Sequence, residues 1–163
     1  MADKKYRPNV AAIVLSSGYP AETKLFIGLR SDMKDVWQFP QGGIDEDESP
    51  KDALFRELDE EIGTDNIEIV SEYPDWEYYD FPDSVAKNKK LYNYDGQKQR
   101  YYLVRVKNDS EINIKIPVFP YFLDYLVIHL YSYPFKISLF SVYSRYQLIV
   151  KQVCFSLQKN LIF

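Results

Sequence analysis

The chain has 163 residues, a formal net charge of −4 and a single cysteine. This length suits one ordinary domain, and the acidic balance argues against a protein that coats nucleic acid non-specifically, because such proteins carry a basic surplus. One cysteine excludes an intramolecular disulfide, and the first residues lack the apolar stretch of a signal peptide, so the cytoplasm is the expected compartment.

The first part of the chain predicts two strands and then a helix. Residues 9–17 and 24–30 are rich in apolar and β-branched side chains and are separated by a Gly-Tyr-Pro turn, which predicts a β-hairpin or meander. A helix is predicted over residues 50–62, because it opens with Ser-Pro and closes at Gly63. Its apolar residues recur at spacings of three and four, so one face packs against the rest of the protein.

The second part predicts more strands and no membrane span. Residues 66–73 and 99–107 have the composition of strands, while residues 74–98 show no clear period and are expected to form a long loop. Strands interleaved with a helix favour an α/β fold with a mixed sheet between helices. Charged residues interrupt the apolar stretch after residue 116 before about 18 uncharged residues accumulate, which argues against a transmembrane helix.

The predicted helix concentrates acidic residues on one face. Glu57, Glu60 and Glu61 are spaced so that their carboxylates project from the same side. Like charges at this spacing destabilise an isolated helix by about 0.2–0.5 kcal/mol per pair, so a divalent cation such as Mg²⁺ would explain them. Taken alone, however, an acidic cluster is more often a solvated helix face, and both interpretations stay open at this point.

The segment around this helix reads GGIDEDESPKDALFRELDEEIG from residue 42 to residue 63. It resembles the signature of the Nudix hydrolases. The matching positions are Gly42, Glu48, Arg56, Glu57, Leu58, Glu60, Glu61 and Gly63. This box is long and specific, so it reverses the preference for a merely solvated acidic face.

The resemblance implies both a fold and a chemistry. The implied fold is the Nudix α/β/α sandwich, with a mixed sheet and the loop–helix–loop of the box. Glu57, Glu60 and Glu61 are implied to bind the metal, Mg²⁺ with Mn²⁺ as a substitute. Arg56 is implied to orient the carboxylates by ion pairing, so Glu57, Glu60 and Arg56 form the implied catalytic set.

Three further positions of the box are implied to be structural. Gly42 and Gly63 would shape the two loops, and Glu48 would support the first loop electrostatically. Thr64 departs from the bulky aliphatic residue that the family usually has there. We expect this departure to be a packing variation that leaves the chemistry intact.

The resemblance continues outside the box, over about residues 6–115. YRPNV at 6–10, WQFPQGG at 37–43 and GQKQRYYLV at 96–104 are similar to the bacterial RNA pyrophosphohydrolase and dinucleoside polyphosphate hydrolase branch. This implies release of pyrophosphate from 5′-triphosphorylated RNA. The alternatives are a diadenosine polyphosphate hydrolase and a catalytically impaired module that binds nucleotides. No membrane contact and no stable protein partner are expected.

Several polar and aromatic side chains are candidates for substrate contacts. The polar candidates are Arg7, Arg30, Gln41, Lys98 and Gln99. The arginines would meet phosphates and the others would line the cleft as donors, although an arginine beside a strand is more often solvated or ion-paired. Tyr101 and Tyr102 alternate along a strand, so one of them could stack on a base, but core packing is the expected role of both.

The composition changes abruptly after residue 116. Only five of the last 47 residues are charged, against 39 of the first 116. The branch has Pro-Glu-Phe here, with a glutamate implicated as a late metal ligand or base, whereas this chain has Pro-Val-Phe with Val118. We therefore divide the chain into a Nudix core over 1–116 and an atypical apolar segment over 117–163. An altered reading frame would explain this segment, and a divergent tail packed as a strand and an apolar helix is the rival explanation.

Overall fold

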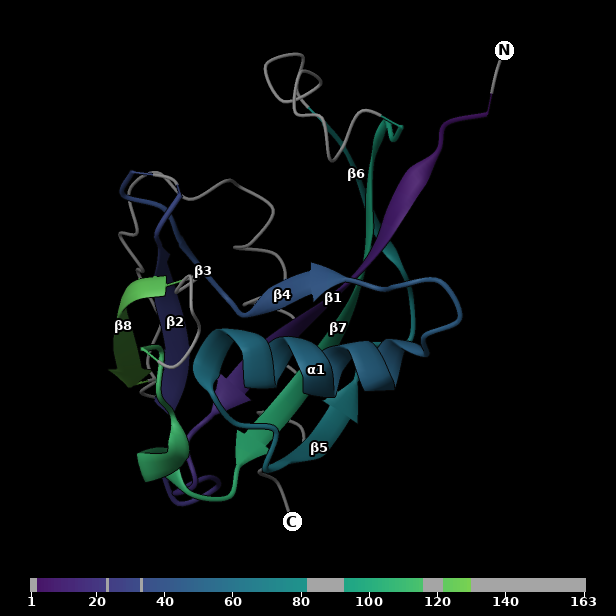
Figure 1. Cartoon of the computed structure of the whole chain (residues 1–163). Helices are drawn as coiled ribbons and strands as arrows, with labels where there is room; N and C mark the ends of the chain where they lie inside the picture. Colours follow the sequence, from purple (N-terminus) through teal and green to yellow (C-terminus); the bar gives the residue numbers. More distant parts are fainter. Residues whose placement is uncertain (1–2, 23, 33, 82–92, 116–121, 130–163) are drawn as a thin grey trace, which may run out of the picture. The chain divides into compact units, whose positions relative to one another are not determined.

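The computed structural model describes residues 3–22, 24–32, 34–81, 93–115 and 122–129. The strands are β1 (Tyr6–Leu15), β2 (Lys24–Arg30), β3 (Trp37–Gln38), β4 (Gln41–Gly43), β5 (Ile67–Glu72), β6 (Glu77–Asp80), β7 (Gly96–Val106) and β8 (Phe122–His129). The helices among these residues are α1 (Pro50–Ile62) and the short 3-10 helix η1 (Asp109–Glu111). Figure 1 shows α1 lying across one face of the sheet.

The strands form one mixed sheet, in which β1 is the central element. The order along the sheet is β3-β2-β1-β7-β5, while β4 pairs with β1, β6 with β7 and β8 with β2. β1 and β7 run parallel, from Tyr6 opposite Gly96 to Leu15 opposite Arg105, and the other pairs are antiparallel. The start of β1 is thus flanked by β4 on one side and by β7 on the other.

Local signals explain where α1 begins and ends. The Ser49 side chain caps the helix by accepting a hydrogen bond from the Asp52 N–H at 3.2 Å. Pro50 occupies the first turn, where its missing N–H has no partner to lose. At the other end Gly63 adopts a left-handed φ of 75°, and its N–H donates to the Asp59 carbonyl at 3.0 Å. The helix therefore stops where the box ends.

The apolar stripe of α1 fixes the helix to the sheet. It consists of Ala53, Leu54, Leu58 and Ile62, each at most 1% exposed. These side chains join a core with Val10, Ala12 and Val14 of β1 and with alternate residues of β7. Burying a leucine or isoleucine contributes roughly 1.5–3 kcal/mol, so this stripe sets which side of the helix remains for the acidic residues.

The structure confirms most of the predicted elements. The helix lies at residues 50–62 as predicted, and the antiparallel pairing of β1 with β2 confirms the opening hairpin. The prediction of a loop over residues 74–98 is wrong at β6 and at residues 96–98, the start of β7, with which β6 pairs. Residues 82–92 of that range lie outside the described residues. The sequence of β6, EYYD, has no apolar alternation, so only its partner strand identifies it.

The mixed sheet with a helix on one face confirms the predicted α/β class. β8 pairs along the edge of β2 and lies inside the segment that its composition marks as atypical. The rest of that segment, residues 117–121 and 130–163 with Val118, lies outside the described residues. Within the described part of the chain, no helix is both long enough and apolar enough to cross a membrane.

Replacing Gly63 by alanine is expected to destabilise the protein by about 1–2 kcal/mol, because the left-handed φ disfavours a side chain. The new Cβ would also lie 2.7 Å from the Asn113 carbonyl oxygen. Thermal unfolding should show a fall in Tm of about 2–4 °C per kcal/mol. Gly18→Ala is the control, since its Cβ would come no closer than 3.4 Å to its neighbours. Equal Tm values for the two variants would contradict this account of the helix end.

Candidate active site

Arg56 of α1 ties the preceding loop to the helix. Its Nε and Nη2 donate to the two carboxylate oxygens of Glu48, each at 2.8 Å. Nη2 also donates to the Gly43 carbonyl at 2.8 Å, and Nη1 donates to Glu57 at 2.8 Å. Hydrogen bonding to Arg56 lowers the pKa of Glu48, so this carboxylate stays charged. A single guanidinium thus fixes one loop carboxylate, one backbone carbonyl and one helix carboxylate.

Glu57 lies directly against Gly42 of β4. A Cβ atom on Gly42 would fall 1.9 Å from the carboxyl carbon of Glu57, so this approach requires glycine. Burial raises the pKa of the Glu57 carboxyl, and the positive charges of Arg56 and Arg7 oppose that rise. The negative charge is therefore held in a partly dehydrated place, where a nearby cation acts strongly on it.

Glu61 is the most buried carboxylate of the site, at 3% exposed. Its Oε2 accepts a hydrogen bond of 2.8 Å from the backbone N–H of Gln41. Burial raises its pKa well above the usual range, and the charge of Glu57 raises it further. The Gln41 N–H and the charge of Arg30 act in the opposite direction. Glu61 is buried and Glu57 is half-buried, and two such carboxylates that repel each other are suited to sharing a positive ion.

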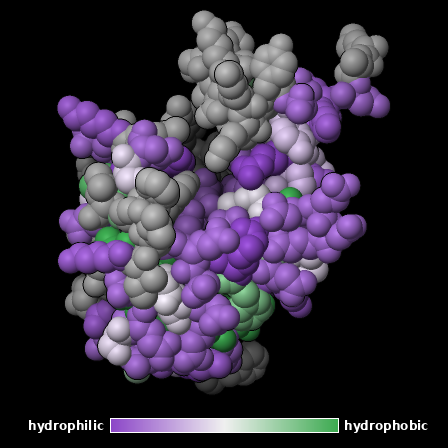
Figure 2. All heavy atoms as spheres, in the orientation of Figure 1, coloured by the Kyte–Doolittle hydropathy of each residue, from purple (hydrophilic) through white to green (hydrophobic). Residues whose placement is uncertain are grey.

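Glu60 differs from these two residues because its side chain is 57% exposed. Arg56 Nη1 reaches it at 3.4 Å, which is a longer contact than the one to Glu57. Figure 2 shows a largely hydrophilic surface over β4 and the adjoining side of α1. The predicted acidic face is thus present, with Glu60 exposed, Glu57 half-buried and Glu61 buried.

The donor set fits a divalent cation that is shared with a ligand. In the residues that the structure describes, no group of three or more Asp, Glu, His or Cys side chains is arranged so that it could hold a metal ion. Mg²⁺ commonly keeps several waters and binds one or two carboxylates together with substrate phosphates. The oxygen atoms of Glu57, Glu60 and Glu61 suit such an open arrangement, in which phosphate and water complete the coordination.

Arg30 and the glutamines form a connected polar group beside these acids. Arg30 at the end of β2 donates from Nε and Nη2 to the two oxygens of Asp32, at 2.7 and 2.5 Å. Its Nη1 donates to Gln38 at 3.1 Å. Gln41 accepts a hydrogen bond of 2.6 Å from Gln99 Nε2. The group therefore connects β2, β3, β4 and β7 across the sheet.

The structure brings four of the five predicted substrate contacts to this region. Arg7 packs over Gly43, where a Cβ atom would lie 2.0 Å from its Nη2. Arg30, Gln41 and Gln99 belong to the polar group just described. Lys98 does not join them, because neighbouring strand residues face opposite sides of the sheet. Its Nζ lies instead over the Trp76 ring, 5.1 Å from the ring centroid.

Three further residues hold these side chains in place, and of these only Tyr101 was a candidate from the sequence, with core packing as its expected role. Asp32 and Gln38 hold Arg30, and the Tyr101 hydroxyl donates to Gln99 Oε1 at 2.9 Å. Tyr102 packs in the core as expected and is 1% exposed. Asp32 lies two residues after Arg30 and reaches it locally, whereas strand pairing brings Gln38 to Arg30 and Gln99 to Gln41.

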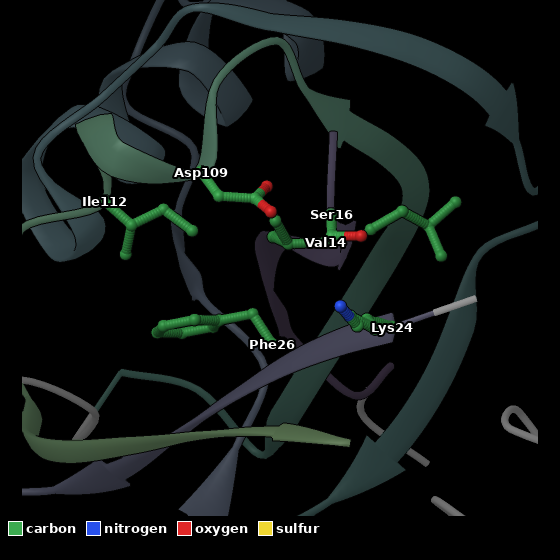
Figure 3. Close-up of a pocket in the computed structure, with 7 residues that line it drawn as sticks. Val14, Ser16, Lys24, Phe26, Asp109 and Ile112 are labelled. Carbon is green, nitrogen blue, oxygen red and sulfur yellow. The ribbon is translucent and has the colours of Figure 1, made fainter. Parts of the chain in front are cut away.

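A separate pocket lies at the other end of β1. It is lined by Val14, Leu15, Ser16, Lys24, Phe26, Asp109 and Ile112. Figure 3 shows the polar groups of Asp109 and Lys24 at this pocket together with the apolar side chains of Phe26 and Ile112. The Asp109 carboxylate accepts a hydrogen bond of 2.7 Å from the Ser17 N–H, which fixes the loop after β1. This pocket contains none of the acidic residues of α1.

Comparison with known proteins identifies the family. The NUDIX domain matches residues 5–124 of the chain. The chain belongs to the Nudix family. It is 63% identical over 123 residues to an RNA pyrophosphohydrolase of Campylobacter jejuni, a match that covers 76% of this chain and 77% of that protein. An RNA pyrophosphohydrolase of Nitratiruptor sp. is 59% identical over 125 residues, covering 77% and 79%.

A solved structure supports the Nudix fold. The dihydroneopterin triphosphate pyrophosphohydrolase of Escherichia coli is similar with a TM-score of 0.56 and 16% identity, over 76% of this chain and 82% of that one. At this identity the likeness concerns the fold alone. The predicted family and the predicted Nudix fold are both confirmed.

The structure also accounts for Thr64, the residue that departs from the usual pattern of the Nudix box. Thr64 is 6% exposed, and its hydroxyl donates to Glu111 at 3.1 Å while it accepts the Asn66 N–H at 3.1 Å. Asn66 Nδ2 donates to the same carboxylate. Thr64 therefore fixes the loop after α1 by hydrogen bonds, where an aliphatic residue would do so by packing alone.

Glu61→Gln is expected to stabilise the metal-free protein at pH 8 by on the order of 1 kcal/mol, because it removes a buried charge and keeps an acceptor for Gln41. Burial raises the pKa of Glu61, so its unfavourable contribution grows as the pH rises through the folded pKa. The gain should vanish near pH 4, where the carboxyl is protonated in the folded and unfolded protein. Thermal unfolding in EDTA at several pH values measures it.

Glu60→Gln is the matched control for this prediction. It makes the same chemical change on the same helix at an exposed side chain, so little stabilisation is expected. A Glu61→Gln variant that is less stable than the wild type at pH 8 would contradict the described burial of this carboxylate.

Proposed function

We propose that this Nudix protein removes pyrophosphate from the 5′ end of triphosphorylated RNA, with Mg²⁺ as its cofactor. The observation that carries the proposal is the 63% identity to an RNA pyrophosphohydrolase. The complete acidic set of the Nudix box on α1 supports it. Because messenger RNA is found in the cytoplasm, this is the proposed compartment.

The reaction breaks one phosphoanhydride bond. Water adds to phosphorus, pyrophosphate leaves with the bridging oxygen, and the RNA keeps a 5′ monophosphate. When bound, Mg²⁺ would neutralise phosphate oxygens and lower the pKa of water. Glu57, Glu60 and Glu61 are the proposed ligands, and Mn²⁺ would be an acceptable substitute. Their oxygens are the hard donors that both ions accept.

The remaining residues of the box would keep these ligands in place. Arg56 orients Glu57 through its hydrogen bond of 2.8 Å, and it holds Glu48 with two more. Gly42 gives Glu57 the room it needs, and Gly63 ends the helix. The proposed catalytic set is therefore Glu57, Glu60 and Arg56. Gly42, Glu48 and Gly63 have supporting roles.

Positive charges on two sides of the acidic face would receive the polyphosphate. The charge of Arg7 acts on Glu57, and the charge of Arg30 acts on Glu61. Guanidinium groups bind phosphate oxygens in a bidentate manner, so both arginines are proposed phosphate contacts. Gln41 and Gln99 belong to the same region. Lys98, placed over Trp76, would meet the RNA further from its phosphates, where the indole offers a stacking surface.

The C-terminal segment would weaken this activity. We propose a Nudix core over 1–116 and an atypical segment over 117–163, on the change of composition at that point. The family match runs past this boundary to residue 124. Val118, which lies outside the described residues, cannot ligate a metal or accept a proton. Resequencing around codon 116 tests an altered reading frame. Finding the same reading frame and the same residues 117–163 in several independent isolates would contradict that explanation.

The test of function is pyrophosphate release by the purified protein with Mg²⁺. Triphosphorylated RNA should be converted to monophosphorylated RNA faster than diadenosine tetraphosphate is split, and RNA with a 5′ monophosphate should release no pyrophosphate. Glu60→Gln should abolish turnover, because it removes a proposed ligand while leaving the fold intact.

Each other result selects a different function. Preference for the dinucleotide would make the protein a dinucleoside polyphosphate hydrolase. If the folded protein acts on neither substrate, the result would indicate an impaired module that binds nucleotides. Full activity in Glu60→Gln would show that the ligand assignment is wrong.

A further inference from the structure

We infer that Tyr101 and Gln99 are positioning residues, which hold Gln41 so that its backbone N–H stays on Glu61. The inference rests on the proposed function, because Glu61 matters there as a metal ligand. It assigns Gln99 an indirect role in place of the substrate contact considered above. It also gives the Tyr101 hydroxyl a role that core packing alone would not require.

A continuous chain of hydrogen bonds carries this inference. The Tyr101 hydroxyl donates to Gln99 Oε1 at 2.9 Å, and Gln99 Nε2 donates to Gln41 Oε1 at 2.6 Å. The backbone N–H of the same glutamine donates to Glu61 at 2.8 Å. Gln41 is therefore held at its side chain by β7 while its main chain holds the buried carboxylate.

An arginine sets the direction of the side-chain hydrogen bonds between the glutamines. Arginine can only donate hydrogen bonds, so Gln38 must present its oxygen to Arg30, which lies at 3.1 Å. The Gln38 oxygen also accepts a hydrogen bond from Gln41 Nε2 at 3.4 Å, the longest bond of the series. Because the Gln41 amide nitrogen points to Gln38, its oxygen, Oε1, points to Gln99. Gln99 must then donate to Gln41 and accept from Tyr101. A tyrosine supplies the required donor, and a phenylalanine would not.

The sheet register places these side chains on one face. β1 lies between β4 and β7, with Ala11 opposite both Gln41 and Tyr101, and with Asn9 opposite Gln99. The small side chain of Ala11 leaves room for the two glutamines to meet across β1. The contact therefore depends on two strand pairings that are far apart in the sequence.

Burial separates this role from a direct contact with substrate. Gln99 is 2% exposed and Tyr101 is 6% exposed, whereas Gln41 is only half-buried. Both polar ends of the Gln99 amide are already engaged within the chain. The hydrogen bonds from Tyr101 through Gln99 to Gln41 are a route by which Tyr101 can act on the reaction without contacting substrate.

The first test is direct Mn²⁺ binding without RNA, followed by electron paramagnetic resonance, in the wild type and in Tyr101→Phe. We expect the variant to bind Mn²⁺ roughly three- to tenfold more weakly, since groups that orient metal ligands commonly change affinity by about tenfold or more. With RNA and sub-saturating Mg²⁺, kcat should fall while KM for the RNA stays unchanged. A direct substrate contact would instead raise KM.

Two further variants sharpen the comparison. Tyr102→Phe removes the same atom from the neighbouring, core-facing tyrosine and should leave Mn²⁺ binding unchanged. Gln99→Glu keeps the size and the acceptor for Tyr101 but loses the donor to Gln41, so it should weaken Mn²⁺ binding as Tyr101→Phe does. It therefore tests the same chain at a second link should Tyr101→Phe fold poorly.

The outcomes separate this inference from the proposed function. Unchanged Mn²⁺ affinity in folded Tyr101→Phe or Gln99→Glu would overturn the positioning role, as would an equal loss in Tyr102→Phe. A wild type that binds Mn²⁺ but releases no pyrophosphate from RNA would overturn the function alone, and the affinities would still decide the positioning role. A wild type without Mn²⁺ binding would overturn both.

Discussion

The guanidinium of Arg56 is the interaction on which the site depends. It joins Glu48 in the loop, the Gly43 carbonyl at the end of β4 and Glu57 on the helix, with four hydrogen bonds of 2.8 Å. Lysine has one ammonium group and cannot match this planar set of donors. Because the loop and the helix meet at the Arg56 guanidinium, this group holds Glu57 close to Gly42.

The site carries charge that folding alone would avoid. Burial raises the pKa of Glu57 and Glu61, and their mutual repulsion adds to this for Glu61. Arg56, Arg7, Arg30 and one backbone N–H offset part of this charge. Functional sites commonly keep such perturbed groups, because a cation and a polyphosphate later complete the electrostatics. The same burial that lowers stability thus favours the binding of a divalent ion.

The sheet supplies the second half of the site. β1 pairs with β4 on one side and with β7 on the other, so residues about 60 positions apart in the chain meet across it. The glutamines and Tyr101 connect the two outer strands, while α1 contributes the acids. Rigid strands and a capped helix are the supports that keep catalytic groups within a few tenths of an ångström of a working geometry.

The sequence by itself determined the helix, the acidic face and the family, because capping residues, helical spacing and the box are all local patterns over residues 42–64. It also placed Arg7, Arg30, Gln41 and Gln99 among the candidates. The sequence did not identify β6, the hold of Gln38 on Arg30, or the separation of Lys98 from Gln99. These depend on strand register and on which face a side chain takes, which only the tertiary pairing of distant segments decides.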